Sequence, residues 1–253
     1  MSRRIGWGIL GTGAIAHKFA LGLAALDYAD LVAVSTSDLL LVPDGVAMDV
    51  AALSEPLATG LMCVRRAGLS IGDRVLVLGG GPIGLAATLW ARFFGARSVV
   101  VSEYLEHRLD LATSMGATAT IDPAGHDVAS RFVELTGGEP DVVIEAAGNA
   151  RAFEAAVAAT APGGVTVTVG LPAPDARSSI SPLGLVAEAR TIIGSYLGSA
   201  VPARDIPKYA QMWREGRLPV EKLISSRIGL DEINRGMDEL ADGNAIRQVI
   251  IFD

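Results

Sequence analysis

The feature that most constrains the fold of this 253-residue chain is a regular alternation of short apolar runs and longer helical stretches. The apolar runs are RVLVLG at 74–79, SVVVSE at 98–103, ATATID at 117–122, DVVIEAAG at 141–148 and GVTVTVG at 164–170. Nearly continuous apolar strands that alternate with helices are typical of a parallel sheet covered on both faces. The sequence therefore predicts the α/β class, with a doubly wound parallel sheet over residues 70–220.

Further elements are expected on either side of this series. Residues 47–67 have a helical pattern, in which Pro56 predicts a kink or a junction of two helices. After the last of the five runs, the pattern predicts a strand at 191–196, a helix at 204–215, a helix at 231–243 and a strand at 246–252.

A glycine-rich turn follows the first strand of the series. Gly79, Gly81 and Gly84 fit the pattern G-x-G-x-x-G. In this pattern the first glycine makes a tight turn, the second lets the backbone approach a pyrophosphate, and the third allows close helix–strand packing. Glu103 ends the second strand at about the 20-residue spacing that the motif prefers, where a carboxylate accepts hydrogen bonds from a ribose and repels a 2′-phosphate. The pattern predicts a Rossmann domain that binds NAD rather than NADP; the alternative is a glycine turn without a ligand.

The chain also opens on a glycine turn of the same kind. Gly11, Gly13 and Ala16 fit G-x-G-x-x-A within IGWGILGTGAIAHKFA. Residues 3–38 resemble the first βαβ unit of the glucose–fructose oxidoreductase and inositol dehydrogenase family, but the E-K-P motif of that family is absent. We expect residues 1–38 to form an additional N-terminal βαβ unit that holds no cofactor of its own.

A second resemblance covers residues 40–253. The segment LVPDGVAMDVAALSEPLATGLMCVRRAGLSIGDRVLVLGGGPIGLAA and the tail motifs IIGSYLGSAVPARDIPKYAQMWREGRLPVEKLI and INRGMDELADGNAIRQVIIF resemble the medium-chain, zinc-type alcohol and polyol dehydrogenases. The resemblance implies hinge helices at 39–69, a cofactor domain at 70–220, and a C-terminal helix and strand at 221–253 that pack on the hinge and the N-terminal unit. It also implies an NAD-dependent oxidoreductase that acts on a small alcohol or carbonyl.

The same resemblance implies a set of cofactor-binding residues. The glycine turn and the residues next to it would hold the pyrophosphate, Glu103 the adenosine ribose, and Arg108 the adenine side, while backbone near the ends of later strands would meet the nicotinamide. The full set is Gly79, Gly81, Pro82, Ile83, Gly84, Glu103, Arg108, Val169, Gly170, Ser195, Leu197 and Arg247. Arg247 would reach back to the pyrophosphate, although both arginines have the plain alternative of a solvated surface position.

A catalytic zinc is not expected in this chain. Zinc-type dehydrogenases carry a separate domain that supplies cysteine and histidine ligands, and here the short βαβ unit stands in its place. A catalytic site needs three converging ligands, whereas Cys63, His17, His107 and His126 are scattered along the chain. Glu55 matches a glutamate that lies near the metal in polyol dehydrogenases. The catalytic residues therefore remain unassigned.

Composition limits the kinds of partner that we expect this chain to bind. The net charge of −7 lacks the basic footprint of a nucleic-acid binder, and no apolar run reaches the length of about 18 residues that a membrane helix needs. The single cysteine suits a reducing compartment, so we expect a cytoplasmic protein. Half of the residues are hydrophobic, and the strand at 191–196 is where cofactor domains of the resembled family meet edge to edge, so a homodimer is expected.

Three functions remain open from the sequence. The first is an NAD(H)-binding oxidoreductase whose substrate site is rebuilt or shared between subunits. The second is a non-catalytic NAD-binding module, and the third is a fold reused for a non-redox role. The first is favoured.

Overall fold

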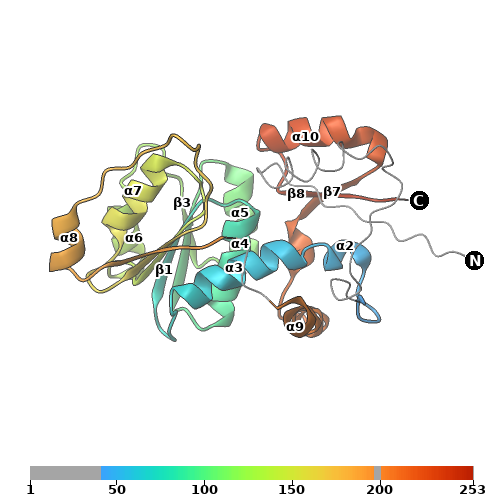
Figure 1. Cartoon of the computed structure of the whole chain (residues 1–253), viewed down its shortest axis with the longest axis horizontal. Coiled ribbons are helices and arrows are strands. Elements are labelled where there is room, and N and C mark those ends of the chain that lie inside the picture. Colours follow the sequence, from blue (N-terminus) through green and yellow to red (C-terminus); the bar gives the residue numbers. More distant parts are fainter. Residues whose placement is uncertain (1–40, 197–200, 253) are drawn as a thin grey trace, which may run out of the picture.

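The computed structural model describes residues 41–196 and 201–252, and its central feature is a six-stranded parallel sheet with strand order β3-β2-β1-β4-β5-β6 (Figure 1). The strands are β1 Arg74–Leu78, β2 Ser98–Ser102, β3 Ala119–Ile121, β4 Val142–Glu145, β5 Val165–Thr168 and β6 Thr191–Gly194. Every neighbouring pair is parallel. The predicted doubly wound α/β fold is therefore confirmed, while the expected N-terminal βαβ unit lies outside the described residues.

Helices cover both faces of this sheet. Val75 and Val77 point into a core shared with α3, α4 and α5, whereas Leu76 and Leu78 point into a core shared with α6 and α7. This division follows from the period of two along a strand, which sends successive side chains to opposite faces. The helices are α3 Ser54–Arg66, α4 Pro82–Phe93, α5 Glu106–Ser114, α6 Val128–Thr136 and α7 Ala150–Ala159.

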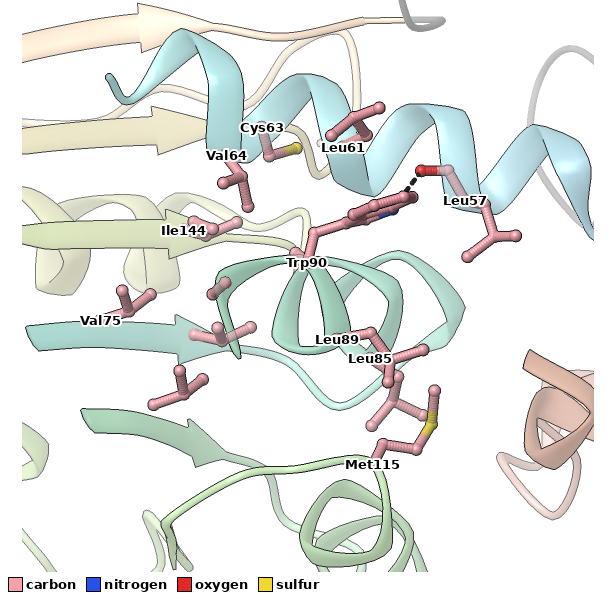
Figure 2. Packing of buried hydrophobic residues seen from close by; sticks show 14 of the residues in the cluster. Leu57, Leu61, Cys63, Val64, Val75, Leu85, Leu89, Trp90, Met115 and Ile144 are labelled. Atoms are coloured by element: carbon pink, nitrogen blue, oxygen red, sulfur yellow. Dashed lines mark hydrogen bonds between the residues drawn. The ribbon is translucent and has the colours of Figure 1, made fainter. Parts of the chain in front are cut away.

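Helix α3 crosses α4 at very short range (Figure 2). A Cβ atom added to Gly60 would lie 2.7 Å from the backbone nitrogen of Ala87, so only glycine fits this crossing. The indole Nε1 of Trp90 donates a 2.8 Å hydrogen bond to the carbonyl of Leu57, which satisfies the polar atom of a side chain that is otherwise buried. The crossing joins the segment before the sheet firmly to the helix that follows β1.

The break in the helical segment 47–67 lies before Pro56. Helix α2 covers Met48–Ala51, residues 52–53 form a turn, and α3 begins at Ser54. Pro56 therefore lies in the first turn of α3, where backbone N–H groups have no partner inside the helix, so that its missing N–H costs nothing. The expected junction of two helices exists, but the proline does not mark its position.

The C-terminal residues form a separate small layer beside the main sheet (Figure 1). Its two strands, β7 (Ile224–Ile228) and β8 (Arg247–Ile250), pair in parallel, and Gly236 of α10 (Ile233–Ala241) packs on Gln248 and Ile228. The strand β7 was not predicted, because only two of its five residues are apolar. Chain elements from β6 onward are α9 Pro202–Arg214, η2 Val220–Leu223, β7 Ile224–Ile228, η3 Leu230–Glu232, α10 Ile233–Ala241 and β8 Arg247–Ile250. Within the described part of the chain, no helix has the length and apolar character needed to cross a membrane.

Candidate nucleotide-binding site

The predicted glycine turn connects β1 to α4, at the carboxyl edge of the sheet. Gly79 has a φ of +102°, a conformation that favours glycine. A Cβ atom at Gly84 would lie 1.9 Å from the carbonyl oxygen of Gly79. The first and third glycines are thus required by the protein's own backbone.

Gly81 differs from these two glycines. Its φ of −75° suits any residue, and a Cβ atom built there would meet nothing within 4 Å. Gly81 is the N-cap of α4, and Pro82 occupies the first helical position. The next residues, beginning with Ile83, carry N–H groups of the first helical turn, the kind of position that binds phosphate. The open space at Gly81 is therefore what a pyrophosphate cradle needs, so the residues present fit a dinucleotide.

Glu103 is held beside this turn by backbone donors. Its Oε2 accepts a 2.9 Å hydrogen bond from the N–H of Gly80, and its Oε1 accepts bonds from the N–H groups of Tyr104 and Leu105 at 2.8 and 3.2 Å. Its side chain is 11% exposed. The sequence motif thus placed an acid next to the glycine turn correctly, with its carboxylate fixed at the end of β2.

Arg108 links Glu103 to the C-terminal layer. Its Nη1 lies 3.7 Å from Oε2 of Glu103, and its Nη2 donates to the carbonyls of Gly243 and Ala245 at 3.1 and 3.4 Å. The side chain is only 17% exposed. The alternative interpretation of Arg108 as a solvated surface arginine is therefore wrong, because its guanidinium lies between two parts of the fold.

Arg247 is also less exposed than a surface arginine. Its side chain is 20% exposed, and its Nη2 lies 3.2 Å from Oε2 of Glu55. Burial lowers the pKa of the guanidinium, and the Glu55 carboxylate opposes this shift. Arg247 is thus a partly desolvated cation on β8 that already has an anionic partner.

Three further predicted residues lie at the carboxyl ends of β5 and β6. The N–H groups of Val169 and Gly170 donate to the carbonyl of Glu145 at 2.9 and 3.2 Å, and the N–H of Ser195 donates to the carbonyl of Thr168 at 2.8 Å. These residues therefore share the sheet edge with the glycine turn. Leu197 lies outside the described residues.

A pocket of about 520 Å³ opens at this end of β4, β5 and β6. Its lining includes Arg66, Glu145, Phe153, Thr168, Gly170 and Tyr196. Glu145 was missed by sequence reasoning. It is 1% exposed, and its oxygens accept hydrogen bonds from the N–H of Gly148 at 2.6 Å and the hydroxyl of Thr168 at 2.8 Å. The sequence feature that could have identified Glu145 is an acid at the end of the apolar strand VVIE.

The described residues do not fit a catalytic zinc. Cys63 is fully buried, its thiol donates to the carbonyl of Thr59 at 3.3 Å, and burial raises its pKa to about 11. His107 and His126 are exposed. Among residues 41–196 and 201–252, no three His, Cys, Asp or Glu side chains could hold a metal ion together. His17 lies outside this part of the chain.

The fold and the turn together define a class of protein. In open α/β sheets, ligands bind outside the carboxyl ends of the strands, where the strand order reverses. Here that reversal lies between β1 and β4, directly beside the Gly79–Gly84 turn. The chain therefore contains a dinucleotide-binding domain of the Rossmann type.

Comparison with known proteins identifies the family. Residues 82–215 match the family model of zinc-binding dehydrogenases. Geraniol dehydrogenase from Castellaniella defragrans is 34% identical over 203 residues, which cover 78% of this chain and 54% of that protein. Alcohol dehydrogenase 1 from Trifolium repens is 32% identical over 212 residues, which cover 82% of this chain and 56% of that protein. The chain spans about half the length of the curated relatives it matches.

A solved structure agrees with this assignment. A zinc-binding dehydrogenase from Sinorhizobium meliloti, bound to NADP, is 31% identical with a TM-score of 0.73, and the match covers 79% of this chain and 58% of that one. The chain belongs to the zinc-binding dehydrogenase family, the medium-chain alcohol dehydrogenases. The resemblance found from the sequence over residues 40–253 is confirmed, whereas the role of each predicted cofactor-binding residue stays a prediction.

Proposed function

We propose that this chain binds NAD(H) at the Gly79–Gly84 turn as the cofactor-binding part of an oxidoreductase that acts on an alcohol or carbonyl. The observation that carries the proposal is the open space at Gly81 beside the anchored carboxylate of Glu103. Family membership supports the oxidoreductase class.

Five of the predicted residues have a definite task in this proposal. Glu103 accepts hydrogen bonds from the adenosine ribose, and Arg247 offsets the charge of the pyrophosphate. Backbone groups at Val169, Gly170 and Ser195 orient the nicotinamide at the ends of β5 and β6. When bound, the cofactor would supply hydride transfer.

The preference for NAD over NADP is part of the same proposal. The carboxylate of Glu103 disfavours a 2′-phosphate through like-charge repulsion. Arg108 is the only cation paired with Glu103 within the described residues, and it also binds the carbonyls of Gly243 and Ala245. We therefore expect the acid, rather than the arginine, to decide which nucleotide binds.

A second candidate function is NAD binding without turnover. It is favoured by the contacts of Glu55, the described acid that matches a metal-proximal position of the family. Its two oxygens accept a hydrogen bond from Thr59 at 3.0 Å and pair with Arg247 at 3.2 Å. Because both of its oxygens already have partners within the fold, the Glu55 carboxylate has a structural role rather than a role in substrate binding.

A homodimer in the cytoplasm completes the proposal. Strand β6 is the last strand of the sheet within the described residues, and helix α8 (Pro182–Ala187) precedes it. Leu183 and Val186 of α8 are 75% and 81% exposed. Exposed apolar side chains and a strand at the edge of a sheet each favour a contact with a second copy. The single cysteine, Cys63, is buried and free, as expected for a reducing compartment.

Titration of the whole chain with NADH and NADPH tests the proposal. We expect NADH to bind at sub-millimolar concentration and NADPH to bind more weakly, as measured by isothermal titration calorimetry. Absence of binding by either nucleotide would refute the nucleotide site. Equal or tighter binding of NADPH would refute the assigned role of Glu103. Assays with primary and secondary alcohols on the same sample separate turnover from binding alone.

A further inference from the structure

An ion pair joins the helix before the main sheet to the last strand of the chain. Glu55 lies in the first turn of α3, and Arg247 is the first residue of β8. One oxygen of Glu55 accepts a hydrogen bond from the Thr59 hydroxyl at 3.0 Å, and the other lies 3.2 Å from Nη2 of Arg247. The Thr59 hydroxyl of the same helix thus orients the Glu55 carboxylate, and the other oxygen faces the guanidinium of Arg247. Its side chain is 56% exposed, whereas that of Arg247 is 20% exposed.

A continuous set of contacts links the chain segment that carries Arg247 to the glycine turn. The N–H of Gly80 donates to Glu103, and Glu103 pairs with Arg108. Arg108 in turn binds the carbonyl of Ala245, two residues before Arg247. The chain segment that carries Arg247 therefore lies against the adenosine side of the carboxyl edge. A cation at that place lies within the field of any dinucleotide bound at the turn.

We propose that Glu55 lowers the affinity for the dinucleotide by competing with the pyrophosphate for Arg247. The inference rests on the proposed function, because it concerns the same nucleotide site. Without nucleotide, the guanidinium is neutralised by Glu55. A pyrophosphate must then share or replace that partner.

The expected size of the effect follows from the exposure of the pair. An ion pair with one partner more than half exposed changes an affinity by about two- to fivefold. The effect must weaken with added salt, since the Debye length falls from about 10 Å at 0.1 M to about 3 Å at 1 M. A purely structural role of Glu55 would not produce this dependence on salt.

Glu55→Gln tests the proposal in the full chain, because glutamine can still accept the bond from Thr59 while it removes the charge. We expect NADH and ADP-ribose to bind about two- to fivefold more tightly at 50 mM KCl, and the gain to shrink at 0.5 M KCl. Adenosine, which carries no phosphate, should bind with unchanged affinity. Glu134→Gln is the matched control, because it breaks a surface ion pair with Arg131 elsewhere on the molecule.

A double variant tests whether Glu55 acts through its partner. In an Arg247→Met background, Glu55→Gln should leave the affinity for NADH unchanged. Unchanged or weaker NADH binding by the single variant overturns the inference, and so does a gain that persists in the Arg247→Met background or extends to adenosine. Unfolding curves of each variant establish that the fold is intact. If the wild-type chain binds no nucleotide, the proposed function fails together with this inference, whereas wild-type binding with an unresponsive Glu55→Gln variant overturns this inference alone.

Discussion

Alanine substitutions at Gly81 and Gly84 should separate an effect on nucleotide binding from an effect on stability. A Cβ atom at position 81 meets no atom of the protein within 4 Å, and φ there is −75°. Alanine loses a little as an N-cap but restricts the unfolded chain, so the two terms nearly cancel and the free energy of unfolding should change by less than about 1 kcal/mol. The added methyl group nevertheless occupies the space that a pyrophosphate needs. We expect Gly81→Ala to weaken NADH binding by at least about tenfold, or about 1.4 kcal/mol.

Gly84→Ala is the matched control. Its added Cβ atom would lie 1.9 Å from the carbonyl oxygen of Gly79, so the turn or the helix must move. Overpacking of this kind costs about 1–3 kcal/mol or more. Urea unfolding followed by circular dichroism should therefore report a loss of stability for Gly84→Ala and none for Gly81→Ala. The reasoning is refuted if Gly81→Ala binds NADH as the wild type does, or if it is destabilised as strongly as Gly84→Ala.

Three further predictions follow from single contacts. Glu103→Ala should weaken NADH binding and relax discrimination against NADPH in the same calorimetric titrations; an unchanged preference would remove Glu103 from the site. Gly60→Ala should destabilise the chain by about 1–3 kcal/mol in urea unfolding, because its Cβ atom would lie 2.7 Å from the Ala87 backbone; a neutral effect would show that the α3–α4 crossing relaxes. The hydrogen bond from Arg204 lowers the pKa of Asp205, whereas burial raises it. The hydrogen bond has the larger effect, so this pKa is about 2 rather than 3.8. Because the folded pKa is the lower one, this stabilisation is complete above pH 3.8 and is lost as the pH falls toward 2; Asp205→Asn should therefore flatten the acid limb of the stability curve, and an unchanged limb would contradict the assignment.

The glycine turn illustrates why the nucleotide site could be predicted in part. The spacing of Gly79, Gly81 and Gly84 and the position of Glu103 at a strand end are local facts, and the fold brings them together as soon as β1 and β2 pair. The motif could not show which glycine is required by the protein's own backbone and which one leaves space for a ligand. Only the structure separates Gly84, which its own backbone demands, from Gly81, which borders open space.

The contacts of the charged residues could not be predicted from local sequence patterns. Arg108 and Arg247 could have been solvated, because nothing in the neighbouring residues records what faces them. Their partners come from the C-terminal loop and from the helix before the sheet, with Glu55 and Arg247 separated by 192 positions. Glu145 was overlooked for the same reason, since its hydrogen bond with Thr168 forms only when β4 and β5 lie side by side.

The sequence by itself therefore determined the class of fold, the order of the main elements and the family, because hydrophobic period, glycine spacing and strand-end chemistry act over short stretches of chain. The tertiary structure alone decided where the hinge segment breaks, that β7 pairs with β8, and which carboxylate neutralises each arginine. Those outcomes depend on burial and on charges brought together from distant positions. Whether GGGPIG is only a tight turn or a nucleotide cradle rests on both kinds of information: the glycine pattern predicts the turn, and the empty space at Gly81 is visible only in the folded chain.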